Sequence, residues 1–424
     1  MQLELFPGMI SKNKLPTNLT SNHYPIHRWF NFIAGFSPEF VKSCIRGADL
    51  GKADVLIDPF AGLSTTLVQA NFQGIRSVGF EPHPFFFDIS QAKINPPSNL
   101  LPVNQIESKI SQVSPYVGEF TSIWSESATR FLTKLIPEQE LRLLAQALLI
   151  EEQIAPLMRQ LYRLIVSRVL ELTSKSQTDG IYKAPTTSKR AVAYHKALKM
   201  TCAELRNDIY TIGDLAKKAT LHNTSSENMS SLERESCSLC VTSPPYLNNF
   251  DFAEMTRMEL YFWKYAGSWR EITENVRRKL IVNTTTAPTD LKKDQDRFKE
   301  TISRQMKSAL DPLVKALQVQ RKTHAGKKDY YLLIYPYFSQ MQSVFMELRR
   351  VLKAGSPFHL IVADSALYGV HIETQELLAR LMQETGFDVL EIEQLRKRGD
   401  RWILKKRAGS KKGLGEYHIL SKRM

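Results

Sequence analysis

The sequence predicts an α/β fold with a mostly parallel sheet and a helical insertion. Two apolar segments that end in turns, 53–62 and 75–84, enclose a helical segment. Strand, helix and strand within about 30 residues are typical of a parallel sheet covered by helices. Residues 102–219 then carry apolar side chains at helical spacing, with few strand signals. Strand segments return after residue 236 and continue to residue 424.

The N-terminal elements are predicted from local signals. "ADVLIDPFAG" is a short apolar run that ends in a turn, as a buried strand does. In the following "STTLVQANFQG", Ser64 and Thr65 favour a helix start and Gly74 favours a helix end. In "IRSVGFEPHP" a second strand is expected to end at Glu81, because Pro82 follows. "FFFDISQAKI" is expected to form the next helix.

The later elements follow the same alternation. "SCSLCVTSPPY" is expected to contain a strand and "MTRMELYFWKY" a helix, whereas residues 270–327 are polar and partly helical. A helix, a turn at Gly355 and a strand over Phe358–Ala363 come next, followed by another helix, Gly386 and a strand. The alternating "GEYHILSKRM" predicts a last strand. This pattern divides the chain into five parts: 1–100, 101–219, 220–266, 267–329 and 330–424.

Composition narrows the class of protein. The chain has 424 residues and a net charge of +14, which favours an anionic partner such as nucleic acid. No run of about 18 apolar residues predicts a membrane helix, and we expect no membrane partner and no secretory signal. Four cysteines are too few for a disulfide framework, so a cytoplasmic location fits. Cys237 and Cys240 form a C-x-x-C without a second ligand pair, and no metal site is expected.

The segment "DPFAGLSTT" has the features of a nucleoside-binding loop. A strand ends there in a glycine turn and a helix opens, so backbone N–H groups at the helix start are placed to meet a carboxylate. Glu81, at the tip of the adjacent strand, is placed to accept hydrogen bonds from ribose hydroxyls. The loop matches neither a phosphate-binding P-loop nor G-x-G-x-x-G. It suits a nucleoside without phosphate, such as S-adenosylmethionine, and the alternative is an ordinary strand–helix turn.

The second candidate site is the tetrapeptide Ser243-Pro244-Pro245-Tyr246, which ends an apolar strand. The two prolines fix φ, remove two N–H donors and keep the preceding residues extended. The serine hydroxyl and nearby carbonyl oxygens therefore point rigidly out of the strand end, beside the flat face of a tyrosine. Such a frame fits a planar heterocycle with an exocyclic amine, which donates to these oxygens while its ring stacks on Tyr246. A structural turn is the alternative reading.

Together, "DPFAGLSTT" and "TSPPY" resemble the signature pair of the amino-directed, S-adenosylmethionine-dependent DNA methyltransferases. That pair is a D-P-F-x-G-x-G-T-T loop and an [S/N/D]-P-P-[Y/F/W] turn. "NHYPIHRWFNFIAGFSPEFV", "LRRVLKAGSPFHLIVADS" and "GEYHILSKRM" also resemble segments of the family. The resemblance covers residues 22–94, 220–264 and 329–424. It implies a Rossmann-like class I methyltransferase sheet, mostly parallel with an antiparallel last strand.

The resemblance also implies roles for single residues. Ser243, Pro244, Pro245 and Tyr246 would form the catalytic turn that holds the target amine and base. Ser64 replaces the second glycine of the loop, and no acidic residue for the adenine is evident in "ATLHNTSSENMSSL", where Asn223 or Ser225 are candidates. The residues expected to bind the cofactor are Asp58, Pro59, Phe60, Gly62, Ser64, Thr65, Thr66, Glu81 and Pro82.

The expected reaction is direct transfer of a methyl group to the exocyclic nitrogen of a base flipped out of double-stranded DNA. Within the family, a serine at the first position of the turn favours cytosine N4 as the methylated atom, and adenine N6 is the alternative target. Carbon-5 methylation would use a cysteine, usually in a Pro-Cys pair, and the chain contains none. A restriction or defence setting, with a separate cognate endonuclease, is expected. An RNA amino-methyltransferase and an inactive nucleic-acid-binding relative remain alternatives.

Two segments carry most of the positive charge. Residues 267–329 contain 15 basic and 8 acidic side chains, and residues 396–424 contain 11 basic and 2 acidic ones. Either the helical insertion or the 267–329 segment with "VRRKLIVNTTTAP" is expected to read the DNA sequence, while the basic stretch between the last two strands is expected to grip the backbone. A solvated surface is the alternative. The candidate DNA contacts are Arg277, Arg278, Lys279, Arg396, Arg398, Lys405 and Lys406.

Overall fold

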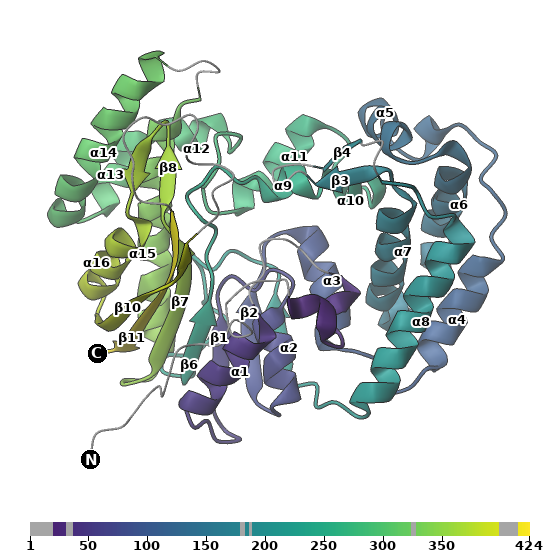
Figure 1. The fold of residues 1–424 in the computed structure, drawn as a ribbon, viewed down its shortest axis with the longest axis horizontal. Helices are drawn as coiled ribbons and strands as arrows, with labels where there is room; N and C mark the ends of the chain where they lie inside the picture. The colour runs from purple at the N-terminus through teal and green to yellow at the C-terminus, as the bar shows by residue number, and fades with distance from the viewer. Residues whose placement is uncertain (1–19, 31–36, 179–182, 186–188, 324–327, 398–413) are drawn as a thin grey trace.

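A seven-stranded sheet forms the centre of the protein (Figure 1). The computed structural model describes residues 20–30, 37–178, 183–185, 189–323, 328–397 and 414–424. The strand order is β10-β11-β7-β6-β1-β2-β5, and every neighbouring pair is parallel except those that β11 makes with β10 and β7. The strands are β1 Val55–Asp58, β2 Arg76–Phe80, β5 Ala219–His222, β6 Leu239–Thr242, β7 Pro357–Ala363, β10 Phe387–Lys397 and β11 Gly415–Arg423. The predicted Rossmann-like methyltransferase sheet with an antiparallel last strand is confirmed.

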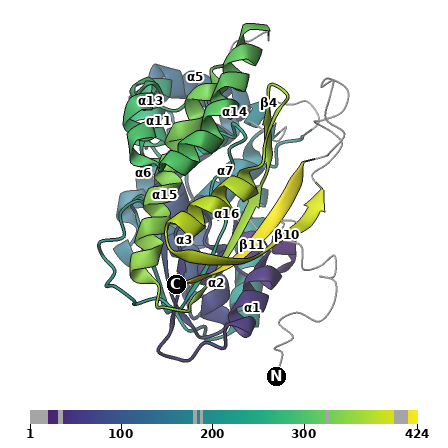
Figure 2. The same ribbon diagram turned by 90° about the vertical axis from the view of Figure 1, so that its left-hand side faces the viewer.

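Helices cover both faces of the sheet, which explains why its strands are apolar on both sides (Figure 2). Leu56 of β1 packs in the cluster that contains α1, whereas the next residue, Ile57, faces the cluster that contains α15. This alternation follows from the two-residue period of a strand. The helices nearest the sheet are α1 Pro38–Gly47, α2 Thr65–Phe72, α3 Pro84–Ile94, α15 Ile334–Val351 and α16 Thr374–Glu384.

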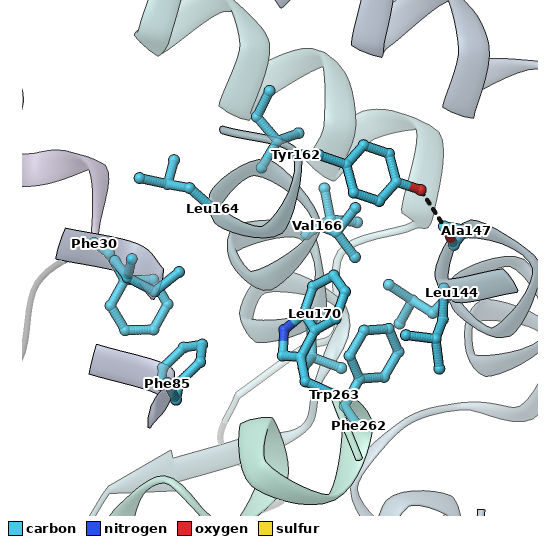
Figure 3. Packing of buried hydrophobic residues seen from close by; sticks show 14 of the residues in the cluster. Phe30, Phe85, Leu144, Ala147, Tyr162, Leu164, Val166, Leu170, Phe262 and Trp263 are labelled. Atoms are coloured by element: carbon cyan, nitrogen blue, oxygen red, sulfur yellow. Dashed lines mark hydrogen bonds between the residues drawn. The ribbon is translucent and has the colours of Figure 1, made fainter. Parts of the chain in front are cut away.

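The expected helical insertion comes between α3 and β5 in the sequence, and in space it lies beside the sheet (Figure 1). The residues Ser243-Pro244-Pro245-Tyr246 form the SPPY turn. The core of the insertion is continuous with the short helices that follow this turn, since Phe262 and Trp263 pack among its leucines and valines (Figure 3). The Trp263 indole Nε1–H donates to Ser167 Oγ at 2.8 Å. The elements of the insertion are α4 Leu101–Ser111, α5 Glu126–Leu135, α6 Glu138–Leu149, α7 Arg159–Thr173, β3 Ser176–Thr178, β4 Lys183–Pro185 and α8 Tyr194–Ile212. The short helices after the turn are α9 Phe252–Met255 and α10 Arg257–Phe262.

The 267–329 segment is also partly helical, as expected, and it packs against α15. Phe298, Met306 and Leu310 are buried in the same cluster as the α15 side chains. The Thr301 and Ser339 hydroxyls lie 2.7 Å apart across this contact. Its helices are α11 Trp269–Asn275, α12 Thr289–Lys293, α13 Gln295–Thr301 and α14 Arg304–Thr323.

Five strands of the described residues escaped prediction, and two of them are β3 and β4, which pair with each other inside the helical insertion. β5 lies at the sheet edge and pairs with β2 alone. β8 Ser365–Leu367 and β9 Val370–Ile372 form a hairpin that turns at Tyr368 and Gly369, both of which have positive φ. None of the helices in the described residues combines the length and the apolar character that a membrane crossing requires.

A buried carboxylate joins the helical insertion to the segment that precedes α1. Asp208 of α8 accepts hydrogen bonds from the backbone N–H of Ile26 at 3.0 Å and from the Trp29 indole at 2.9 Å, and it forms an ion pair with Arg28. Ile26 has a φ of 63°, which is costly for a β-branched residue. The contacts of Asp208 therefore hold a strained turn against the insertion.

We expect Asp208→Ala to lower the free energy of unfolding by about 3 kcal/mol, because it leaves buried donors and a cation without their acceptor. Urea titration measures this change. Asp214→Ala, at an exposed position just after the same helix, is the matched control and should change it by less than about 0.5 kcal/mol. Equal effects of the two variants would show that the Asp208 contacts do not stabilise the fold.

Candidate functional site

The two predicted sites meet at one edge of the sheet, because β1 and β6 are adjacent parallel strands. Ile57 pairs with Cys240, so the loop after β1 and the turn after β6 leave the sheet at the same level. A hydrogen bond joins them directly: the Thr242 hydroxyl donates to Asp58 Oδ1 at 2.6 Å. Thr242 and Asp58 are both buried. The last residue of one strand is therefore bonded to the last residue of its neighbour.

The loop after β1 makes two left-handed bends. Gly62 has a φ of 51° and Ser64 a φ of 61°. Glycine adopts this conformation readily, whereas a serine there costs about 1–2 kcal/mol. Helix α2 begins at Thr65, and the Ser64 side chain does not cap it. Ser64 is instead buried, and its Oγ has no hydrogen-bond partner among the described residues. It lies where the related loop pattern has its second glycine, a residue type that adopts such a positive φ without strain.

Asp58 has one buried carboxylate oxygen that the fold does not use. Its Oδ1 accepts from the Phe60 N–H at 3.0 Å and from Thr242, whereas its Oδ2 has no partner within the described part of the chain. Burial raises the pKa of Asp58 to about 6, against the opposing hydrogen bonds that Thr242 and Phe60 donate to Oδ1. A buried carboxylate oxygen without a donor is costly. Asp58 is therefore suited to a ligand that brings a cationic or N–H donor group.

Glu81 lies directly after β2, beside the loop, and is buried. Its Oε1 accepts the His83 N–H at 2.7 Å. Burial, helped by the nearby charge of Asp58, raises the pKa of Glu81 to about 8, although backbone hydrogen bonds from His83 and Gly62 act to lower it. Two carboxyl groups with raised pKa values thus lie at neighbouring strand ends, as binding sites often have.

The other predicted cofactor residues surround these two. Pro59 and Thr66 are buried, and Phe60, Thr65 and Pro82 are half-buried. The Asn223 amide donates to the backbone carbonyl of Glu81 at 2.9 Å, so Asn223 is brought to this edge by β5.

The SPPY turn is held by side chains from three distant parts of the chain. The Pro245 carbonyl accepts the Tyr337 hydroxyl of α15 at 2.9 Å. The Tyr246 carbonyl accepts the Asn283 amide at 3.3 Å. The Tyr246 hydroxyl donates to Glu416 Oε1 of β11 at 3.0 Å. Pro244 is buried, whereas Ser243, Pro245 and Tyr246 are half-buried. The turn is therefore rigid, with its serine and tyrosine at the end of the sheet.

The polar stretch "VNTTTAP" belongs to the 267–329 segment, one of the two candidates for reading the DNA sequence, and it supports the chain after the turn. Asn283 donates to the Phe250 carbonyl at 3.0 Å, and Asn249 Oδ1 accepts the Thr285 N–H at 2.8 Å. Asn249 has a φ of 62°, so these bonds hold a left-handed residue. The Asn283 and Thr285 side chains thus have partners within the protein.

The candidate DNA contacts fall into different environments. The prediction that Arg277 contacts DNA needs correction. Its side chain is only 1% exposed, forms an ion pair with Asp251 at 2.8 Å and lies over the Trp269 ring. It is not placed at the surface, because the acidic partner and the ring bury it. Arg278 is exposed and pairs with Glu274 and Asp290. Lys279 is exposed.

The remaining basic candidates lie near the end of β10. Arg396 donates to Glu416 Oε2 at 2.7 Å and is therefore engaged with a buried carboxylate. Arg398, Lys405 and Lys406 lie outside the described residues. Cys237 and Cys240 are buried, and no group of three or more metal-ligating side chains gathers within the described ranges.

Sequence reasoning missed three supports of the turn: Tyr337, Asn283 and Glu416. A weak signal existed for the last one, because a glutamate early in an alternating, otherwise buried strand is unusual. The other two carry no local signal, since their partners are 92 and 37 residues away.

The raised pKa of Glu81 predicts a pH-dependent stability of the ligand-free protein. A glutamate usually titrates near 4.3 in the unfolded chain, so the folded state binds more protons between about pH 4.3 and 8, and stability falls as pH rises through this range. We expect Glu81→Gln to be more stable than the wild type by on the order of 3 kcal/mol at pH 8, and the gap to close towards pH 5.

Urea unfolding from pH 5 to 8.5 measures this gap. Glu384→Gln, an exposed carboxylate at the end of α16, is the matched control and should leave the wild-type pH profile unchanged. A Glu81→Gln gap that does not vary with pH would contradict the assignment.

The chain is similar in sequence to proteins that are named as type II methyltransferases. No protein-family model matches the chain. The chain is 22% identical, over 91% of its length, to the type II methyltransferase M.BsoBI of Geobacillus stearothermophilus, of which the alignment covers 83%. It is 24% identical, over 87% of its length, to the type II methyltransferases M.AvaI of Nostoc sp. strain PCC 7120 and of Anabaena variabilis, of which 80% is covered. The similarity thus extends along most of both chains.

Proposed function

We propose that this protein is a site-specific DNA methyltransferase that uses S-adenosylmethionine and modifies the exocyclic amine of a flipped base. Cytosine N4 is the favoured target, because the turn begins with Ser243, and adenine N6 is the alternative. The observation that carries the proposal is the Asp58–Thr242 hydrogen bond, which joins the cofactor loop to the SPPY turn at one sheet edge. Relatives named as type II methyltransferases support the same class and a restriction-modification setting.

The residues at the loop fit S-adenosylmethionine. Asp58 Oδ2, buried and without a partner in the described chain, would accept from the ammonium group of its methionine part. Glu81 would accept from the ribose hydroxyls. The backbone N–H groups at the start of α2 would be available to the carboxylate. When bound there, S-adenosylmethionine supplies an electrophilic methyl group beside the SPPY turn.

The turn would bind and orient the base. The Ser243 hydroxyl oxygen and a neighbouring carbonyl would accept the N–H groups of the target amine, which draws its lone pair out of conjugation with the ring. The Tyr246 ring would stack on the base. Because the prolines and the three supporting side chains keep the turn rigid, little reorganisation is needed before reaction.

We expect Ser243→Ala and Tyr246→Ala to lower methyl transfer by about 100-fold or more, because each removes a contact to the reacting base. Binding of S-adenosylmethionine should change little. Asp58→Asn should instead weaken cofactor binding by about tenfold, since the charge that pairs with the ammonium is lost. Labelled S-adenosylmethionine with plasmid DNA, followed by digestion to nucleosides, measures the transfer and identifies the modified atom.

Ser230→Ala and Tyr210→Ala, both at exposed positions, are matched controls that should keep full activity. A fully active Ser243→Ala/Tyr246→Ala double variant would refute the site. Label found only in RNA would refute DNA as the substrate.

Lys279 is an exposed candidate for a phosphate contact. Lys279→Ala should weaken DNA binding uniformly across sequences and reduce the slope of log K against log salt by about one. Lys52→Ala, an exposed lysine before β1 at the opposite end of the strand, should leave the slope unchanged. An unchanged slope in Lys279→Ala would exclude this lysine as a phosphate contact.

A further inference from the structure

Glu416 is a buried carboxylate at the same edge of the sheet. It lies at the start of β11, in register with Ala363 of β7 and with Arg396 of β10. Its side chain is 5% exposed. A carboxylate in this position costs free energy unless both oxygens receive hydrogen bonds. The buried position of Glu416 therefore calls for partners.

Each oxygen of Glu416 has one strong donor. Oε2 accepts Arg396 Nε–H at 2.7 Å. Oε1 accepts the hydroxyl of Tyr246, the tyrosine of the SPPY turn, at 3.0 Å. The Ser243 hydroxyl in turn donates to the Tyr246 hydroxyl oxygen at 3.5 Å. A continuous chain of hydrogen bonds therefore runs from Ser243 through Tyr246 to Glu416.

The direction of this chain is set at its buried end. A carboxylate only accepts hydrogen bonds, so the tyrosine proton must point to Glu416. The tyrosine oxygen is then left to accept the serine proton. Ser243 consequently offers only acceptor lone pairs to a ligand, which is what an amine N–H requires. The same contact also fixes the tip of the Tyr246 ring, whose terminal torsion is otherwise broad.

We propose that Glu416 is a positioning residue for methyl transfer: it holds the Tyr246 ring in place and directs the Ser243 proton away from the target amine. Arg396 compensates the buried charge of Glu416. This inference rests on the proposed function, in which Ser243 and Tyr246 hold the base. Glu416 itself contacts the tyrosine and not the base.

Glu416→Gln tests the direction of the hydrogen bonds with almost no change in shape. The oxygen of the new side-chain amide must face the Arg396 donor. The amide NH₂ would then face Tyr246 and reverse the direction of the hydrogen bonds from Ser243 to residue 416. Tyr246→Phe removes the hydroxyl through which Glu416 acts while keeping the ring. The experiment is a cycle of wild type, both single variants and the double variant, with single-turnover methyl transfer to unmethylated plasmid DNA and the dissociation constant of S-adenosylmethionine as readouts.

We expect Glu416→Gln and Tyr246→Phe each to slow single-turnover transfer by about 10- to 100-fold, with cofactor affinity changed by less than about threefold. The double variant should be no slower than the slower single variant, because both changes break the same chain. Glu391→Gln, an exposed glutamate on the adjacent strand β10, makes the same chemical change as a control and should keep the wild-type rate.

A double variant whose loss is the product of the two single losses would overturn the inference, as would an unchanged rate in Glu416→Gln. If Glu416→Gln lowers the melting temperature, Glu416→Asp repeats the cycle, because it keeps the charge and withdraws the carboxylate from Tyr246. Its loss should again vanish in the Tyr246→Phe background, and a loss that persists there would overturn the inference. Failure of the proposed function looks different, since the wild type itself would then transfer no methyl group to DNA.

Discussion

The whole site depends on two parallel strands that end side by side. β1 and β6 are hydrogen-bonded neighbours, and the Thr242 hydroxyl fastens the end of β6 to Asp58 at the end of β1. This contact uses one oxygen of a buried carboxylate for the fold and leaves the other for a ligand. The distance between the glycine loop and the SPPY turn is thereby set by the spacing of adjacent strands, about 4.8 Å. Two groups bound at these strand ends would lie close enough to react.

Much of the remaining polar structure holds this edge in place. Asn283, Tyr337 and Glu416 come from three separate parts of the chain and bind the same turn. The buried Arg277–Asp251 ion pair stabilises the segment that follows this turn. Buried charges of this kind rarely add net stability, but they specify one arrangement when every donor and acceptor is paired. The 267–329 segment therefore does more than extend the surface, because its Asn283 side chain helps to support the turn.

The central sheet and both motif loops could be predicted because their signals are local. A buried strand, a glycine turn and a helix start lie within a dozen residues around Gly62, and the double proline marks the end of β6. Features that rest on distant contacts could not be predicted. Three consecutive basic residues at Arg277 suggest a surface, and its acidic partner lies 26 residues earlier. β5 has only four residues at a half-exposed edge, so it carries little hydrophobic pattern. The partner of Glu416 lies 170 residues away.

A crystal structure with S-adenosylhomocysteine would show whether the ends of β1 and β6 form one site. We expect the amino group of the ligand to lie on Asp58 and its ribose on Glu81, with the sulfur facing the Ser243–Tyr246 turn. A ligand bound at the opposite end of the strands, or with its sulfur turned away from that turn, would contradict this expectation.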